Sequence, residues 1–306
     1  MSDAIVPDRE HVPDSEYESL VARLPGLPRD LAMLARFDRP IGWWLLFWPC
    51  VWGVWLAGAG WQLPLLGWLL LGAIAMRGAG CVYNDVVDAD LDRQVARTAS
   101  RPVASGRVTA RLAWAWLGAL CLVGLAVLLQ LRWQAQVVAL ASLALVAAYP
   151  FMKRITWWPQ AWLGLVFTWG ALVGWTALRV DRPEVIAALY AGAVCWCIGY
   201  DTIYALQDRE DDTLVGIRSS ALRLGNRVQA GVLAFYCLAL AFWSLAFWLL
   251  RGDWLALLAL APAAAHLLWQ GLTLDSGDPA NPLARFRSNR TAGALVAAAC
   301  LVVGNA

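Results

Sequence analysis

Residues 65–102 read LLGWLLLGAIAMRGAGCVYNDVVDADLDRQVARTASRP, an apolar run that ends in four aspartates followed by arginines. A helix needs about 20 apolar residues to cross a hydrocarbon core about 30 Å thick, and residues 62–83 supply a run of that length. The sequence therefore predicts a transmembrane helix whose carboxyl end carries charged groups out to the membrane surface.

The rest of the chain repeats this alternation of long apolar runs and short polar connections. Of its 306 residues, 60% are hydrophobic and the mean hydropathy is +0.57, whereas a soluble protein has about 45–50% apolar residues. Only helices and closed barrels satisfy every backbone polar group in lipid. The sequence predicts an all-α polytopic membrane protein with about nine transmembrane helices surrounding a central cavity. The expected spans are 41–59, 62–83, 110–130, 133–150, 159–178, 183–204, 228–250, 253–272 and 290–305.

The amino-terminal segment differs from the remainder of the chain. Residues 1–30 are polar and lack the apolar core of a signal peptide, so we expect them to form a mobile tail. Residues 31–306 are expected to form a single transmembrane domain in the lipid bilayer. The net charge is only +2, which argues against nucleic acid as a partner.

Basic residues are distributed unevenly between the two sides of the predicted bundle. The side opposite the amino terminus carries only Arg132, Arg179, Arg182 and Arg251, and most other basic residues lie in connections on the amino-terminal side. Basic loops of membrane proteins face the cytoplasm. We therefore expect a multi-pass protein of the cell inner membrane, with its amino terminus and its acidic loops on the cytoplasmic side.

Two acidic clusters begin where predicted helices leave the membrane on this same side. The first follows the span 62–83, and the second follows the span 183–204 in the stretch YDTIYALQDREDD. If the helices continue, residues three or four apart share one face, and like charges on that face repel. Ionisable groups at membrane depth usually mark a functional site. The two predicted stripes are Asn84, Asp88 and Asp92, and Asp201, Tyr204, Asp208 and Asp212.

The chemistry of these side chains points to a metal-bound phosphate. Carboxylate and amide oxygens without Cys or His nearby favour Mg²⁺, which keeps waters and bridges carboxylates to substrate phosphates. Cations that could hold a phosphate follow: Arg97 and Arg101 after the first cluster, and Lys153, the only lysine, after the fourth span. Arg77 lies two turns before Asn84, inside a span. The arrangement predicts a lipid phosphate or diphosphate as the substrate.

These motifs resemble those of the UbiA-type intramembrane prenyltransferases. The signature N-D-x-x-D-x-x-x-D with R-T-x-x-R-P is present at 84–92 and 97–102, and the second signature, D-x-x-x-D, at 208–212. The stretches RFDRPIGWWLLFWP, YPFMKRITWWPQ and YDTIYALQDREDD are similar to the branch that acts on 4-hydroxybenzoate. The resemblance covers residues 36 to about 305. It departs at GIRSSA, where Arg218 stands at a position that is more often Lys.

The resemblance implies an activity and a set of site residues. A polyprenyl group would pass from polyprenyl diphosphate to the ring carbon ortho to the hydroxyl of 4-hydroxybenzoate, as in ubiquinone biosynthesis, and diphosphate would be released. Arg36 or Arg77 would bind the benzoate carboxylate, and Asp201 would orient or deprotonate the phenol. The residues that would bind Mg²⁺ are Asn84, Asp85, Asp88, Asp92, Asp208 and Asp212. Those that would bind the diphosphate are Arg97, Arg101, Lys153, Tyr204 and Arg218.

Other functions fit the residues less well. Homogentisate or a naphthoate is an alternative acceptor within the same family. A CDP-alcohol phosphotransferase needs the pattern D-G-x2-A-R-x8-G-x3-D-x3-D, but Ala110 and Trp114 stand at the last two Asp positions. A cation transporter often has broken helices near the midplane of the membrane, whereas these carboxylates gather on one side beside cations that could hold a phosphate.

Overall fold

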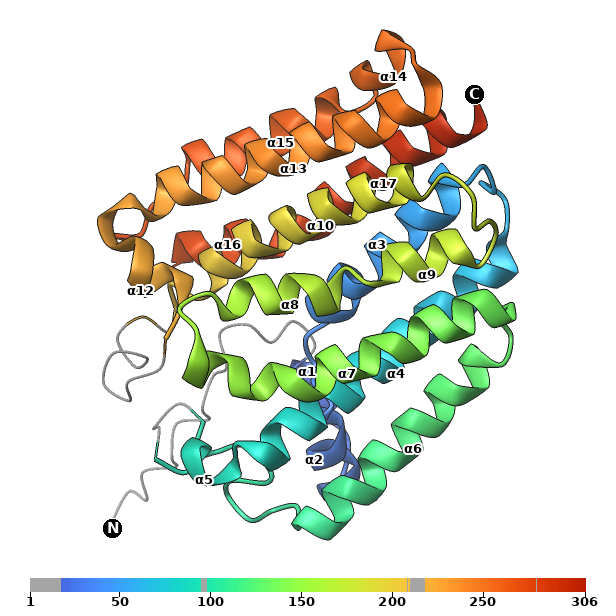
Figure 1. Ribbon diagram of the computed structural model, residues 1–306. Helices are drawn as coiled ribbons and strands as arrows, with labels where there is room; N and C mark the ends of the chain where they lie inside the picture. Colours follow the sequence, from blue (N-terminus) through green and yellow to red (C-terminus); the bar gives the residue numbers. More distant parts are fainter. Residues whose placement is uncertain (1–17, 95–97, 208, 210–217, 279) are drawn as a thin grey trace, which may run out of the picture.

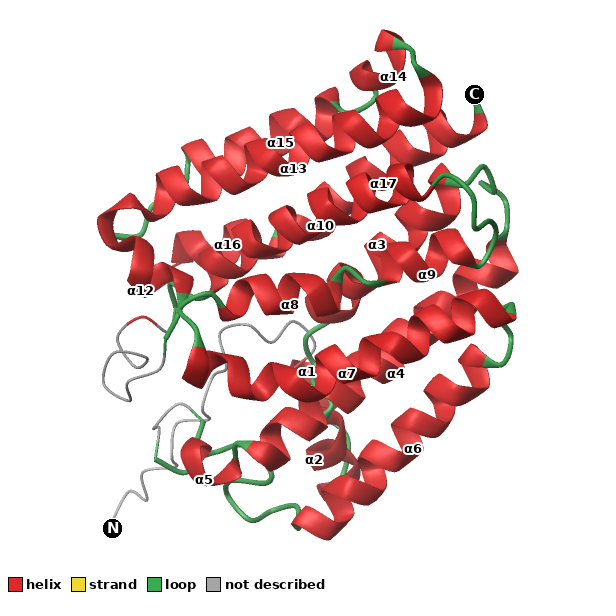
Figure 2. Ribbon diagram, viewed as in Figure 1, coloured by secondary structure: helices red, strands yellow, loops and turns green. Residues whose placement is uncertain are grey.

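Long helices lying side by side make up the described part of the chain (Figure 1). The computed structural model describes residues 18–94, 98–207, 209, 218–278 and 280–306. Every regular element within these residues is a helix, which confirms the predicted all-α class (Figure 2). The elements are α1 (Glu18–Val21), α2 (Gly26–Leu34), α3 (Ile41–Leu56), α4 (Leu63–Val87), α5 (Ala89–Asp92), α6 (Ala110–Leu128), α7 (Trp133–Ile155), α8 (Pro159–Phe167), α9 (Gly170–Thr176), α10 (Pro183–Tyr204), α12 (Ser220–Leu224), the 3-10 helix η1 (Gly225–Arg227), α13 (Val228–Arg251), α14 (Trp254–Leu258), α15 (Ala261–Leu272), α16 (Ala280–Arg287) and α17 (Asn289–Asn305).

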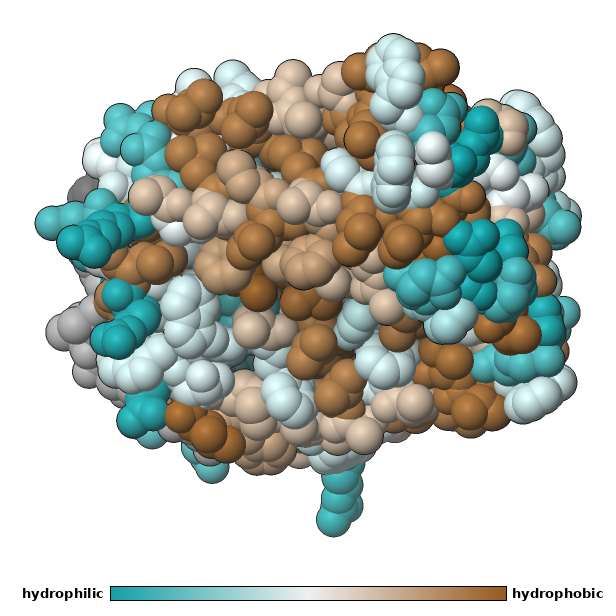
Figure 3. Space-filling view, turned by 45° about the horizontal axis from the view of Figure 1, so that its top comes forward, coloured by the Kyte–Doolittle hydropathy of each residue, from teal (hydrophilic) through white to brown (hydrophobic). Residues whose placement is uncertain are grey.

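Within the described ranges, six helical segments are long and apolar enough to cross a membrane: Leu63–Val87, Ala110–Leu128, Trp133–Met152, Pro183–Tyr204, Ser220–Arg251 and Trp254–Leu272. Apolar residues cover the middle of one face of the molecule, with polar residues towards two ends (Figure 3). The prediction of a multi-pass membrane protein is thus confirmed. The predicted count of nine spans is not, because α3 and α17 are shorter and the expected span 159–178 is divided into α8 and α9.

Two short helices occupy part of the segment that we expected to be a mobile tail. α1 and the first half of α2 lie within residues 18–30. α2 is tied to the bundle because Arg107 pairs with Asp30 at 3.2 Å and the Trp116 indole donates to the Leu31 carbonyl at 3.2 Å. The folded chain therefore begins before residue 31. The rest of the predicted tail, 1–17, lies outside the described residues.

Glycines let α3 pack closely against α9 and α17 at the centre of the bundle. A Cβ atom on Gly53 would overlap the Ala171 carbonyl, and one on Gly174 would overlap the Cys50 carbonyl. Gly304 of α17 meets the backbone at the carboxyl end of α3 in the same way. Small residues are common where membrane helices meet, because lipid gives no hydrophobic drive to association and close backbone packing must supply the attraction.

Three buried tryptophans join α3 to the helices on its other side. The Trp52 ring lies 5.0 Å from the Trp196 ring of α10 and 5.4 Å from the Trp243 ring of α13, measured between centroids. The Trp52 indole also donates to the Gly293 carbonyl of α17 at 2.9 Å. Large aromatic rings with fully buried surfaces thus fix α3, α10, α13 and α17 relative to one another.

The close packing of α3 predicts that Gly174→Ala destabilises the protein by about 1–3 kcal/mol, because the added methyl group overlaps a backbone carbonyl of α3. The matched control is Gly118→Ala in α6, where a Cβ atom meets nothing within 4 Å. Thermal unfolding in detergent should show a lower Tm for the first variant and an equal or slightly higher Tm for the second. Equal Tm values for both variants would contradict this account.

Candidate functional site

The first acidic cluster lies where α4 passes into α5. The two helices are separated at Asp88, but the amide of Asp88 still donates to the Asn84 carbonyl at 2.9 Å, and the amide of Asp92 to the Asp88 carbonyl at 2.8 Å. These bonds keep the helical spacing of four residues across the break. The predicted stripe of Asn84, Asp88 and Asp92 along one face is therefore confirmed. Asp88 and Asp92 are both buried.

Two arginines neutralise part of this negative charge. Nη2 of Arg36 lies 3.1 Å from both carboxylate oxygens of Asp85. Nη1 of Arg101 donates to Oδ1 of Asp85 at 3.2 Å and to Oδ2 of Asp92 at 2.8 Å. Asp85, which we predicted as a metal ligand, is thus a buried carboxylate whose two oxygens accept bonds from guanidinium groups. These contacts join the α2–α3 connection, the end of α4 and the loop after α5.

Arg36 has an unusual backbone conformation for a residue with a side chain. Its φ is 57°, in the left-handed region that favours glycine, and such a conformation costs about 1–3 kcal/mol. The conformation is held because its side chain also donates to the Met33 carbonyl at 3.2 Å, besides pairing with Asp85. Backbone strain of this kind is typical of functional sites.

The segment with the R-T-x-x-R-P motif folds back onto the acidic cluster. The Thr98 hydroxyl donates to the Asp92 carbonyl at 2.9 Å, and the Arg101 amide donates to the Thr98 carbonyl at 3.0 Å. The turn closes with a bond from the Val108 amide to the Pro102 carbonyl at 2.9 Å. This local structure explains why Arg101 reaches two carboxylates. Arg97, the other arginine of the motif, lies outside the described residues.

The carboxylates of the cluster remain only partly compensated. Burial raises the pKa of Asp92 above its usual value, Arg101 lowers it in opposition, and the charges of Asp85 and Asp88 raise it further. An additional cation at this place would relieve the repulsion among the three carboxylates. Among the described residues no three His, Cys, Asp or Glu side chains are placed to hold a metal ion together, and the predicted ligands Asp208 and Asp212 lie outside that part of the chain.

Arg77 and Asp201 place opposite charges deeper in the bundle. The Arg77 guanidinium lies 5.4 Å from the centre of the Phe167 ring, and its Nε is buried without a hydrogen-bond partner among the described residues. The charges of Arg77 on α4 and Asp201 on α10 both act on the buried phenols of Tyr149 and Tyr200. Arg77, Asp201 and these two phenols thus place polar groups of α4, α7 and α10 within the otherwise apolar bundle.

The described residues include the beginning of the second acidic motif, with Tyr204, and the chain that follows it, from Arg218. Tyr204 is the last residue of α10, and its ring lies 4.6 Å from the ring of Phe286, measured between centroids. Arg218 donates to the Ile155 carbonyl at 2.8 Å and its guanidinium lies 5.5 Å from the centre of the Trp157 ring. Arg218 therefore contacts the end of α7. Lys153 belongs to the last turn of α7, but its side chain is outside the described part.

The two motifs leave their helices at the same end of the bundle, at the left of Figure 1, where α4 passes into α5 and α10 ends near α12. Sequence reasoning missed three features of this region: the pairing of Asp85 with Arg36, the bond from Thr98 to the backbone and the contact of Phe286 with Tyr204. Only the Thr98 bond had a local signal, because Thr in a turn commonly bonds to nearby backbone groups.

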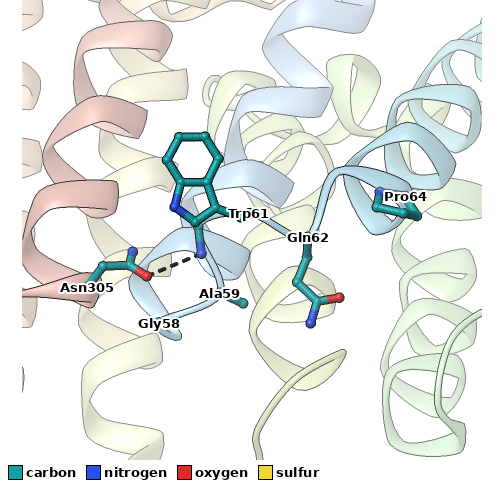
Figure 4. Close-up of a pocket in the computed structure, with 7 residues that line it drawn as sticks. Gly58, Ala59, Trp61, Gln62, Pro64 and Asn305 are labelled. Atoms are coloured by element: carbon teal, nitrogen blue, oxygen red, sulfur yellow. Dashed lines mark hydrogen bonds between the residues drawn. The ribbon is translucent and has the colours of Figure 1, made fainter.

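A hollow of about 380 Å³ lies at the other end of α4, between the α3–α4 connection and the carboxyl terminus (Figure 4). Gly58, Trp61, Gln62 and Asn305 are among its lining residues, and the Gly60 amide donates to the Asn305 side chain at 3.3 Å. Its lining contains no charged side chain. Because α4 spans the bundle, this hollow is separate from the acidic cluster.

Comparisons with known proteins agree with one another. The profile of the UbiA prenyltransferase family matches residues 46–298. The mitochondrial 4-hydroxybenzoate polyprenyltransferase of Arabidopsis thaliana is 44% identical over 277 residues, which are 89% of this chain and 68% of that protein. The apo structure of a UbiA homolog from Aeropyrum pernix K1 has a TM-score of 0.70 at 25% identity, over 85% of this chain and 97% of that chain. A UbiA homolog from Archaeoglobus fulgidus bound to GPP and Mg²⁺ has a TM-score of 0.68 at 18% identity, over 90% of this chain and 100% of that chain.

The geometry of the cluster predicts that Asp85→Asn lowers the free energy of unfolding by about 3 kcal/mol, because two largely buried arginines lose their shared counter-charge. Asp90→Asn is the matched control, since its side chain is 93% exposed and pairs with Arg93 at the surface. Thermal unfolding of the purified variants measures both effects. A drop in Tm for Asp90→Asn as large as that for Asp85→Asn would show that the buried pair has no special weight.

Proposed function

This chain belongs to the UbiA prenyltransferase family, and on that premise we propose that it transfers a polyprenyl group from polyprenyl diphosphate to 4-hydroxybenzoate. The new bond joins the prenyl chain to the ring carbon ortho to the hydroxyl, and diphosphate leaves. The observation that carries the proposal is the stripe of Asn84, Asp88 and Asp92, whose two carboxylates are buried, beside Arg101 at the end of a helix that spans the bundle.

The donor set fits Mg²⁺. Asn84, Asp88 and Asp92 offer oxygen ligands on one face. Burial, and to a smaller degree the charges of Asp85 and Asp88, raise the pKa of Asp92, and a cation bound there would offset both effects. We assign these three residues to metal binding, together with Asp208 and Asp212 of the second motif. Mg²⁺, when bound, would supply the charge that stabilises the departing diphosphate. The Archaeoglobus fulgidus homolog of this fold is bound to GPP and Mg²⁺, which supports the assignment.

The cationic residues around the stripe would hold the diphosphate. Arg101 forms ion pairs with both Asp85 and Asp92. Its guanidinium group is therefore close enough to the carboxylates to bind a phosphate oxygen of a diphosphate held beside them. The contacts of Asp85 suit it to positioning Arg36 and Arg101 rather than to binding metal. The remaining residues that we assign to the diphosphate are Arg97, Lys153, Tyr204 and Arg218.

The acceptor would bind deeper in the bundle, beside Arg77 and Asp201. Arg77 is the stronger choice for the benzoate carboxylate, because its Nε has no partner among the described residues whereas Arg36 already pairs with Asp85. Asp201 would orient the phenol hydroxyl or accept its proton as the ring attacks. An allylic cation must be kept from water, and the apolar walls and aromatic rings of the bundle can do so.

We also propose an orientation for the chain in the membrane. The connections that carry the acidic motifs are rich in Arg, whereas the opposite side carries only Arg132, Arg179, Arg182 and Arg251. The basic side faces the cytoplasm in most membrane proteins. The chain is therefore assigned to the cell inner membrane, with the site open to the cytoplasmic side.

An acceptor panel tests the proposed reaction. Purified protein in detergent with Mg²⁺ and a polyprenyl diphosphate should form prenylated 4-hydroxybenzoate and an equal amount of diphosphate, because the two products arise in one step. Homogentisate and a naphthoate serve as competing acceptors in the same assay. Product from either of these but none from 4-hydroxybenzoate would assign another acceptor, and ion flux in liposomes without any product would favour a transporter.

The metal assignment predicts that Asp88→Ala lowers kcat/KM by about 10²-fold or more, because a buried ligand to the ion that stabilises the leaving group is lost. Asp90→Ala in the same motif should retain wild-type kcat/KM, since Asp90 is exposed. Both variants are to be assayed over a range of Mg²⁺ concentrations, with thermal unfolding to confirm that they are folded. Full activity of Asp88→Ala would remove the residue from the metal site.

A further inference from the structure

α16 is a short helix that sequence reasoning did not predict, and it contacts the second acidic motif. Its residues Ala280–Arg287 connect α15 to α17 beside the end of α10 (Figure 1). Phe286 is its buried aromatic residue. The Phe286 ring lies 4.6 Å from the Tyr204 ring and 6.0 Å from the Tyr200 ring, measured between centroids. One face of the Tyr204 phenol is thus covered by a residue more than 80 positions later in the chain.

A buried asparagine fixes Phe286 in place. Nδ2 of Asn289 donates to the carbonyls of Arg285 and Phe286, each at 3.2 Å. Oδ1 of Asn289 accepts from the Trp196 indole of α10 at 2.8 Å. Asn289 and Trp196 are both completely buried, so these bonds form away from water. The backbone at Phe286 is therefore anchored to the same helix that carries Tyr204.

A second set of bonds holds the junction of α16 and α17 from the other side. The Gln270 amide of α15 donates to the Ser288 hydroxyl at 2.8 Å, and its oxygen accepts from the Tyr236 hydroxyl of α13 at 2.7 Å. The Arg285 guanidinium lies 4.1 Å from the centre of the Trp269 ring of α15. Tyr236, Gln270 and Ser288 are paired with one another, and a paired buried network rigidifies its surroundings, because each member would be costly to leave unpaired.

These contacts support the Tyr204 side chain at the point where α10 ends. Tyr204 is the last residue of the helix, so no following turn of α10 flanks its side chain. The ring can keep one orientation only if neighbouring elements confine it. Phe286 supplies such a wall, and a ring-to-ring contact at this distance adds about 0.5–1.5 kcal/mol to simple burial.

We propose that Phe286, held by Asn289, is a positioning residue that fixes the Tyr204 ring for binding the diphosphate group of the prenyl substrate. The proposal rests on the proposed function, in which Tyr204 contacts the diphosphate. It assigns to α16 a role in one half of the substrate site, the phosphate half, and none in binding the aromatic acceptor. The two halves can be separated experimentally.

The test measures binding of inorganic diphosphate in the presence of Mg²⁺ by calorimetry, and the KM for 4-hydroxybenzoate by product formation. Phe286→Leu should weaken the Kd for diphosphate about tenfold, the size of one hydrogen bond to a charged group, and leave the acceptor KM unchanged. Phe286→Tyr keeps the ring and should bind as the wild type does. Phe247→Leu is the matched control, because Phe247 is a fully buried phenylalanine in α13 outside the site.

A double variant decides whether Phe286 acts through Tyr204. Tyr204→Phe should weaken diphosphate binding to a similar degree, and adding Phe286→Leu should have no further effect, because the hydroxyl being positioned is already absent. An unchanged Kd for Phe286→Leu, an additive double variant, or an equal loss in Phe247→Leu would overturn the inference. Wild-type protein that binds diphosphate but does not prenylate 4-hydroxybenzoate would instead overturn the proposed acceptor. Wild-type protein that binds no diphosphate would overturn both.

Discussion

The ion pairs of Asp85 are the interaction on which the structure at the acidic end of the bundle depends. An unpaired carboxylate buried at the end of a membrane helix would cost many kcal/mol, so the fold must bring cations to it. Arg36 arrives from the α2–α3 connection and Arg101 from the loop after α5. Three chain segments are thereby joined at one carboxylate. The strained backbone of Arg36 and the turn that presents Arg101 both follow from this requirement.

The packing of the bundle places functional side chains at two depths, one at the ends of α4 and α10 and one further inside. α4 carries the stripe at its end and Arg77 two turns earlier, and α10 carries Tyr204 at its end and Asp201 one turn earlier. The buried tryptophans hold α10 against α3 and α13, so the charges of Arg77 and Asp201 act on the same phenols. Buried carboxylates paired with arginines at one end of the bundle, and the apolar helices beyond them, match a substrate with a phosphate head and a lipid tail.

Local pattern predicted much of this structure and missed what depends on contacts distant in sequence. The apolar runs predicted the long helices, and the spacing of four residues predicted that Asn84, Asp88 and Asp92 share one helical face. The break between α8 and α9 was not predicted; the Thr168 hydroxyl there donates to the Gly164 carbonyl at 2.7 Å, a bond that often bends helices. Arg36, one of the two partners of Asp85, is 49 residues away, and no periodicity within α4 indicates it.

The glycine contacts of α3 have a consequence for how this protein can be altered. At Gly53, Gly174 and Gly304, where α3 meets α9 and α17, backbone touches backbone, so no side chain stands at these three contacts to be shortened. Engineering that seeks room for a bulkier prenyl chain has nothing to remove along those contacts. Adaptable volume lies instead with the larger side chains elsewhere in the bundle, and libraries that vary chain-length preference are best directed to them.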